Sequence, residues 1–129
     1  MPAVIKKTMS LGKRNIAGMI KRYPQIELIY LFGSKAKRPG VKARDIDIAV
    51  LFRRVPKGIA ELDLRVRLEN ALKNSLGGPI DLVLLNTAPI ALKQQVLKYG
   101  NLLFERRKGL HNIFFAETNG EAIDRLRGM

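Results

Sequence analysis

Two stretches of the sequence decide the fold. They are IELIYLFGS, residues 26–34, and DIDIAVLF, residues 45–52. The first is an apolar run that ends at Gly33-Ser34, which is typical of a buried strand followed by a turn. The second alternates at its start and then becomes continuously apolar, which predicts another buried strand. Residues 35–44 between them are basic and predict a connection.

The flanking sequence adds further strands and helices. Apolar residues at helical spacing over residues 9–23, stopped by Pro24, predict a first helix. Further strands are predicted at 80–85 and 102–104. A helix is predicted at 89–99, with Thr87 as its N-cap, and another is predicted at 112–127.

Residues 59–76 fit two patterns. Between Glu61 and Glu69 polar and apolar residues alternate strictly, as they do in a strand. The same segment places Leu64, Leu68 and Leu72 on one face of a helix. It is longer than a strand of about 4–8 residues and ends at two glycines, so we predict a helix. Without repeats or a linker, the element order predicts a single α/β or α+β domain over residues 1–129, with a small mixed sheet of about four strands flanked by helices.

Composition limits the chemistry. The chain has 129 residues, no cysteine and one histidine. The missing cysteines exclude disulfides, thiolate zinc sites, iron–sulfur clusters and a cysteine nucleophile, and the single histidine excludes any site that needs two. Catalysis by this chain would therefore depend on carboxylates, hydroxyls or a hard metal ion.

The net charge is +13, and residues 1–44 carry eleven Lys and Arg but only one acid, Glu27. Such a surface attracts nucleotides, nucleic acids, acidic proteins or membranes, or it only keeps the protein in solution. The basic N-terminus has a superficial likeness to a transit peptide but is better explained as an ordinary helix. No apolar run approaches the roughly 18–20 residues of a membrane span. We therefore expect a cytoplasmic protein with no membrane contact.

Three acids stand at the starts of strands. Asp45 and Asp47 are two residues apart, so their side chains point to the same face. Adjacent carboxylates repel, and Mg²⁺, which prefers carboxylate and phosphate oxygens, relieves that repulsion. Asp81 joins them if its strand is a neighbour. An Asp at this position can also cap a turn or pair with Arg44, so the D-x-D spacing alone does not distinguish a metal site from these structural roles.

Gly33-Ser34 favours a nucleotide site over a turn cap. The pair follows a buried strand where the chain turns, and such a turn presents backbone N–H groups and the Ser34 hydroxyl to a phosphate. Glycine also allows the ligand to approach the backbone closely. An ordinary turn at the end of a strand has the same residues.

In combination, LFGSKA at 31–36, DIDI at 45–48 and IDLV at 80–83 resemble the nucleotidyltransferase superfamily of DNA polymerase beta. Within it, they resemble the minimal nucleotidyltransferases of the MNT or MntA type, whose pattern is hG-S-x-A-x-G, then S-D-[IL]-D, then a third Asp in a later strand. The likeness continues from Leu85-Asn86 through Tyr99-Gly100 and over residues 102–105, and it covers roughly residues 10–106. It implies a nucleotidyltransferase-like fold.

The resemblance implies a metal-dependent enzyme that transfers a nucleoside monophosphate, with AMP from ATP expected, to a hydroxyl of a partner protein. Two Mg²⁺ ions are implied, held by the same residues that are catalytic. The implied catalytic and metal-binding residues are Asp45, Asp47 and Asp81. The implied nucleotide-binding residues are Gly33, Ser34, Lys35 and Arg44, with Lys37 as a further cation.

The sequence departs from the family pattern at two positions. Arg38 stands where the family has its second glycine, and Arg44 stands where a serine precedes the first Asp. Both changes imply that basic side chains replace backbone contacts to the phosphates. They affect nucleotide choice and rate more than the metal site.

MNT proteins typically act as antitoxins of HEPN ribonucleases, so the resemblance implies a HEPN toxin partner in a homo- or hetero-oligomer. One alternative is an inactive module whose basic surface binds nucleic acid or an acidic protein. Another is AMP transfer to a small molecule such as an aminoglycoside, although those enzymes usually carry an additional domain. Arg106 and His111 have the Arg-x4-His spacing of HEPN ribonucleases, which we interpret as coincidence because Gly109 interrupts the required helix.

Overall fold

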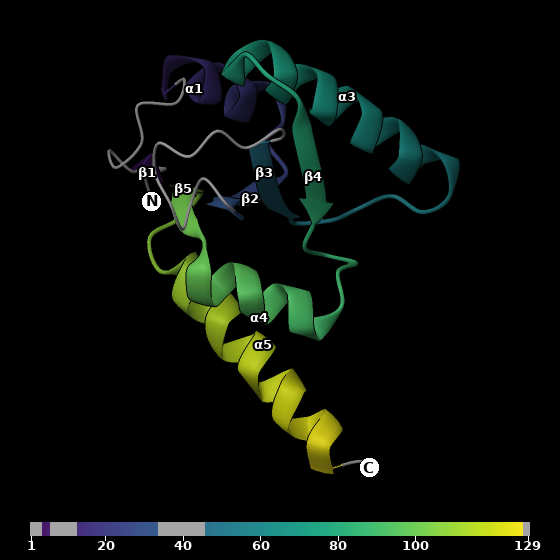
Figure 1. The fold of residues 1–129 in the computed structure, drawn as a ribbon, viewed down its shortest axis with the longest axis vertical. Coiled ribbons are helices and arrows are strands. Elements are labelled where there is room, and N and C mark those ends of the chain that lie inside the picture. Colours follow the sequence, from purple (N-terminus) through teal and green to yellow (C-terminus); the bar gives the residue numbers. More distant parts are fainter. Residues whose placement is uncertain (1–3, 6–12, 34–45, 128–129) are drawn as a thin grey trace.

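The computed structural model describes residues 4–5, 13–33 and 46–127 (Figure 1). Every strand and helix predicted above is present, and a two-residue strand near the N-terminus is an addition. The basic connection at 35–44 lies outside the described residues. The elements are β1 (Val4–Ile5), α1 (Lys13–Arg22), β2 (Ile26–Phe32), β3 (Ile46–Phe52), α3 (Ile59–Leu76), β4 (Ile80–Leu84), α4 (Ile90–Tyr99), β5 (Asn101–Glu105) and α5 (Leu110–Arg127).

The strands form one mixed sheet in the order β1-β5-β2-β3-β4. Strand β2 pairs antiparallel with both β3 and β5, whereas β3 and β4 are parallel. A parallel pair needs a crossover connection, and α3 provides it. The predicted mixed sheet is therefore confirmed.

Helices cover both faces of the sheet. Helices α1 and α3 lie on one side of it, and α4 and α5 lie on the other (Figure 1). Alternate residues along each strand supply the two cores. Ile48 and Val50 face α1 and α3, while Ala49 and Leu51 face α4 and α5. This double cover explains why β2 is an almost continuous apolar run rather than an alternating one.

The ambiguous segment 59–76 is a helix. Helix α3 turns Leu68 and Leu72 into the core, with Leu64 partly buried beside them. Leu62 and Val66, which complete the alternating pattern, remain exposed. The helix ends at Gly77 with φ of 75°, a left-handed conformation that glycine adopts without strain. Length and the glycine stop therefore predicted this element correctly.

The predicted N-cap of α4 is wrong. Pro89 directly precedes the helix, and no side chain caps it. The N–H of Thr87 donates to the carbonyl of Leu84 at 3.3 Å, so Thr87 belongs to the turn that ends β4. Pro89 has the extended backbone of an N-cap residue, with ψ of 151°, so the helix begins at Ile90 without a side-chain cap. No helix among the described residues is long and apolar enough to span a membrane.

Candidate active site

Two of the three predicted carboxylates are neighbours in the sheet. Asp47 on β3 and Asp81 on β4 are register partners in the parallel pair. Partners on adjacent strands lie about 5 Å apart and point to the same face. The parity of the strands places both on the face that α4 and α5 cover, because Ala49 and Val83 continue the same two rows. The expectation that these strands are neighbours is confirmed.

The turn after β2 is built against the same carboxylate. Phe32 is the antiparallel register partner of Asp47, and Gly33 follows it. Gly33 has φ of 78°, and a Cβ added to it would overlap Oδ2 of Asp47. Any larger residue at position 33 would displace the Asp47 side chain. Glycine here therefore serves a close approach as well as a turn.

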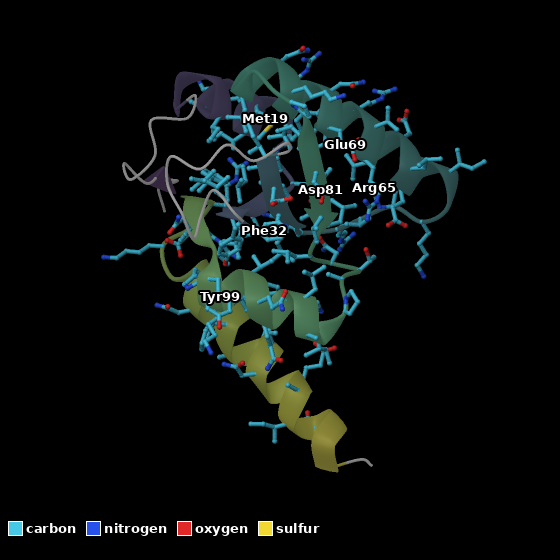
Figure 2. All side chains as sticks on the ribbon, viewed as in Figure 1. Met19, Phe32, Arg65, Glu69, Asp81 and Tyr99 are labelled. Carbon is cyan, nitrogen blue, oxygen red and sulfur yellow. The ribbon has the colours of Figure 1, made fainter. Side chains whose placement is uncertain are left out.

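The carboxylate pair is open to ligands. Asp47 is half-buried and Asp81 is exposed, because both lie at the ends of their strands and beyond the packed core. Figure 2 shows Asp81 on β4, Phe32 at the end of β2 and Tyr99 at the end of α4. A Cβ at Gly100 would meet the carbonyl of Leu31 at 3.3 Å, so Gly100 brings the end of α4 close to this end of β2. Tyr99, the last residue of α4, is exposed next to Gly100.

Four predicted site residues, Ser34, Lys35, Arg44 and Asp45, lie outside the described residues, as does Lys37. Within the described part of the chain, no group of three or more acids and histidines is arranged to hold a metal ion. The described donors are the two carboxylates of Asp47 and Asp81, side by side and accessible. Oxygen donors of this kind fit Mg²⁺.

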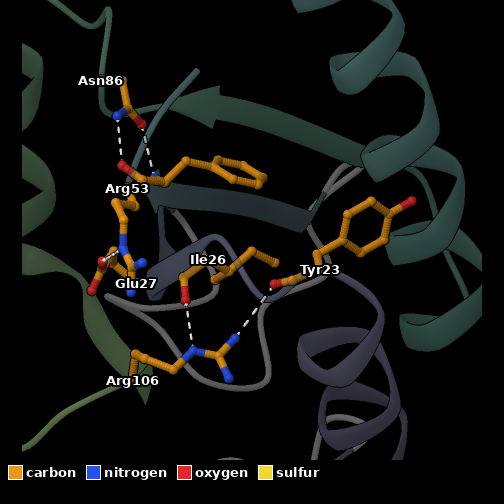
Figure 3. Close-up of polar contacts among 7 residues, drawn as sticks. Tyr23, Ile26, Glu27, Arg53, Asn86 and Arg106 are labelled. Atoms are coloured by element: carbon orange, nitrogen blue, oxygen red, sulfur yellow. Dashed lines mark hydrogen bonds and ion pairs between the residues drawn. The ribbon is translucent and has the colours of Figure 1, made fainter. Parts of the chain in front are cut away.

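Polar contacts also stabilise the other end of the sheet, where β3 ends and β2 begins (Figure 3). These contacts do not involve Asp47 or Asp81. The side chain of Asn86 accepts from the N–H of Phe52 at 2.9 Å and donates to its carbonyl at 2.7 Å. Arg106 donates to the carbonyls of Ile26 and Ile20, each at 3.0 Å. Burial lowers the pKa of the Arg106 guanidinium, as expected for a cation that serves structure. Arg53 also pairs with the buried Glu27 at 3.2 Å.

Arg106 and His111 do not form a common site. The Arg106 side chain faces the carbonyls at the end of α1 and the start of β2. His111 lies in the first turn of α5, and its Nδ1 is hydrogen-bonded to the hydroxyl of Tyr30 at 2.7 Å. Gly109, with φ of 96°, separates the two residues before α5 begins. Each side chain is held by hydrogen bonds to a different part of the fold, which agrees with the interpretation of their spacing as coincidence.

The sequence matches a known protein-family model. The model described as "Polymerase beta, Nucleotidyltransferase" matches residues 14–109, which include the glycine turn, β3, β4 and β5. The chain belongs to this nucleotidyltransferase family. The resemblance inferred from three short motifs is thereby confirmed, together with the nucleotidyltransferase-like fold.

Relatives within the family are more specific. Protein adenylyltransferase MntA of Shewanella oneidensis is 40% identical over 81 residues, which are 63% of this chain and 55% of that protein. The chain thus spans about half the length of that curated relative. A chain of a toxin–antitoxin crystal structure with AMP-PNP has a TM-score of 0.72 and 31% identity, over 92% of this chain and 91% of its own. The structure of a tri-AMPylated Shewanella oneidensis HEPN toxin in complex with MNT antitoxin matches with a TM-score of 0.66 and 30% identity, over 91% and 87%.

Proposed function

We propose that this nucleotidyltransferase transfers AMP from ATP to a hydroxyl of a HEPN-type toxin and thereby acts as its antitoxin. The register pairing of Asp47 with Asp81, next to the turn at Gly33, carries the proposal because it places two accessible carboxylates beside a turn that could present backbone N–H groups to a phosphate. Relatives named as a protein adenylyltransferase and as an antitoxin bound to an AMPylated HEPN toxin support the choice of nucleotide and acceptor.

In this proposal the carboxylates hold Mg²⁺. Asp47 and Asp81 would be ligands, with Asp45 as the third ligand that the family resemblance implies. The fit rests on oxygen donors that lie side by side at an accessible strand end. When bound, Mg²⁺ neutralises phosphate charge and lowers the pKa of the attacking hydroxyl. Two ions are expected from the family resemblance.

The remaining residues position the triphosphate. The backbone N–H groups of the turn at Gly33, together with the Ser34 hydroxyl, would donate hydrogen bonds to phosphate oxygens. Lys35, Lys37 and Arg44 would balance the charge of the triphosphate and, in the place of the missing second glycine, would supply side-chain contacts. Because Gly33 has no Cβ, the Asp47 carboxylate can lie directly against the backbone of the turn that would bind the phosphates.

The proposed reaction is an in-line displacement at the α-phosphorus. The acceptor hydroxyl oxygen bonds to the α-phosphorus, and the bond from that phosphorus to the oxygen bridging to the β-phosphate breaks. Pyrophosphate leaves with the electron pair of that bond, and the hydroxyl proton passes to solvent. The chain contributes orientation and charge neutralisation, which suits a site without a histidine base.

The test is transfer of label from α-labelled ATP, in Mg²⁺, to a purified HEPN toxin. We expect protease-sensitive label on the toxin that falls at least about 100-fold in Asp47→Asn and in Asp81→Asn. Asp124→Asn is the matched control, since Asp124 is an exposed acid on α5. Label that only ribonuclease removes would make RNA the acceptor. Full transfer by Asp47→Asn would refute the carboxylate assignment.

A further inference from the structure

Two hollows adjoin on the side of the sheet covered by α1 and α3, and the smaller one lies at the end of β3 opposite Asp47. The larger has a volume of about 490 Å³, and its polar lining is Arg22, Tyr23, Arg67, Asn70 and Asn74. The smaller has a volume of about 190 Å³, with apolar walls from Pro24, Phe52, Pro56 and Leu64 and with Arg54 beside them. Arg22 and Tyr23 line both hollows, so the two form one continuous surface, called here the α1/α3 surface.

The α1/α3 surface is positively charged and accessible. Arg22 and Arg54 are exposed, and neither forms a salt bridge with a carboxylate of the described residues. Arg67 pairs with Asp63 at 3.0 Å, but both side chains are largely in water, where such a pair contributes little. Three guanidinium groups can therefore bind an incoming anion, and their planar donors suit phosphate.

The smaller hollow gives this surface a second property. Its walls are mostly apolar, and the half-buried Tyr23 lines both this hollow and the larger, more polar one. A polyanion that also carries planar apolar groups would satisfy both hollows together. Single-stranded nucleic acid has that alternation, because its phosphates are charged and every base has a face that stacks on an aromatic ring. An acidic peptide carries planar groups only where it has aromatic residues, whereas a nucleic acid carries one base with every phosphate.

We propose that the α1/α3 surface binds single-stranded nucleic acid. Arg22, Arg54 and Arg67 contact the phosphates, and one base lies in the smaller hollow against Tyr23. Asn70 and Asn74 supply donors and acceptors along the strand. The chain's net charge of +13 favours association with such a polymer.

This site is separate from the proposed site of AMP transfer. Phe52, in the wall of the smaller hollow, lies five residues after Asp47 on β3, about 17 Å away at about 3.3 Å per residue. Phe52 also faces the α1/α3 core, whereas Asp47 belongs to the opposite face. The inference therefore does not depend on the proposed function, and either could fail alone.

The test is fluorescence anisotropy with labelled oligouridylate and oligothymidylate, each about ten nucleotides long. We expect Arg22→Ala/Arg54→Ala/Arg67→Ala to weaken binding about tenfold or more and to lower the slope of log K against log salt by about 2. The control, Lys98→Ala/Arg107→Ala/Lys108→Ala, removes the same charge from exposed residues on the α4/α5 side. Equal losses in both triple variants would mean diffuse attraction and would overturn the site.

Two further arms test the base and the class of partner. Abasic oligonucleotides should bind the wild-type protein about fivefold more weakly, and Tyr23→Leu should remove that difference. If abasic and intact strands bound alike, the base contact would be wrong. A polyglutamate peptide that displaced the oligonucleotide at equal charge concentration would overturn the proposal in favour of an acidic protein partner. The oligouridylate and oligothymidylate affinities identify the natural polymer, and all variants must keep the wild-type unfolding temperature.

Discussion

Oδ2 of Asp47 occupies the space into which a side chain at Gly33 would project. The contact joins the end of β2 to the start of β3, the two strands whose sequences indicate a nucleotidyltransferase. It makes the glycine turn and the first described carboxylate one structural unit. Changes to either residue should therefore affect both.

Replacing Gly33 with Ala should damage the site more than the same change at a glycine with the same left-handed backbone conformation. Gly77 has φ of 75°, close to the 78° of Gly33, but a Cβ at Gly77 meets nothing within 4 Å. In both variants, backbone strain should lower the free energy of unfolding by about 1 kcal/mol or more. Gly33→Ala should in addition move Asp47 and lower AMP transfer at least about tenfold. Thermal unfolding and transfer rates, measured together, separate the two effects, and equal activity in both variants would contradict the contact.

Mg²⁺ with a non-hydrolysable ATP analogue should stabilise the protein. At a ligand concentration of one hundred times Kd, the free energy of unfolding should rise by about 2.7 kcal/mol. Asp81→Asn should abolish most of that rise because it removes one of the two adjacent carboxylates. Thermal melts with and without ligand give the answer independently of turnover. A full shift in Asp81→Asn, with Asp124→Asn as the reference, would exclude Asp81 as a ligand.

Arg106 and Arg107 are neighbours in the sequence, but replacing each with Ala should have very different effects on stability. Arg106 donates to backbone carbonyls and lies 4.9 Å from the centre of the Phe104 ring, whereas Arg107 is exposed. Arg106→Ala leaves those carbonyls without their donor and should cost about 2–3 kcal/mol of stability. Arg107→Ala should change stability by less than about 0.5 kcal/mol. Chemical denaturation measures both, and similar losses would show that Arg106 is not the structural member of the pair.

Tyr30 should make the protein sensitive to alkali. Burial raises the pKa of Tyr30 well above its ordinary value of 10.0, and the nearby Glu105 charge raises it further. The unfolded chain therefore loses this proton first, and stability falls as pH rises above about 10, by up to about 1.4 kcal/mol per pH unit. Tyr30→Phe removes the hydrogen bond to His111 and should lower the free energy of unfolding by about 1 kcal/mol at neutral pH. Above pH 10 the stability of this variant should fall less steeply than that of the wild type. Identical alkaline slopes in urea titrations would rule out this role.

The strands and helices were predictable because their patterns are long and end at glycine or proline. The run at 26–32 and the helix at 59–76 illustrate this, and the second was ambiguous only because leucines satisfied both periods. Thr87 was misassigned because a threonine before a proline helix start suits a turn equally well. Strand β1 has two residues, too few for any period to appear.

The candidate site was predictable in part. The D-x-D and Gly-Ser motifs are local, so Gly33 and Asp47 could be singled out without coordinates. The contact between them, and the pairing of Asp47 with Asp81, depend on strand register, which the sequence does not encode locally. The α1/α3 surface joins residues from α1, β3 and α3, so no single motif could have revealed it.

The strand order also has a consequence for synthesis on the ribosome. Strands β2, β3 and β4 lie within residues 26–84, so Asp47 and Asp81 can meet before β5 has emerged. Val4 of β1 cannot pair until its partner Glu105 of β5 has been synthesised. Until β5 is in place, one edge of β2 has no neighbouring strand. Such long-range pairings form slowly, and an open edge is where a nascent chain aggregates or recruits a chaperone. The end of the sheet that holds Asp47 and Asp81 is thus completed early, and β1 and β5 complete the other edge last.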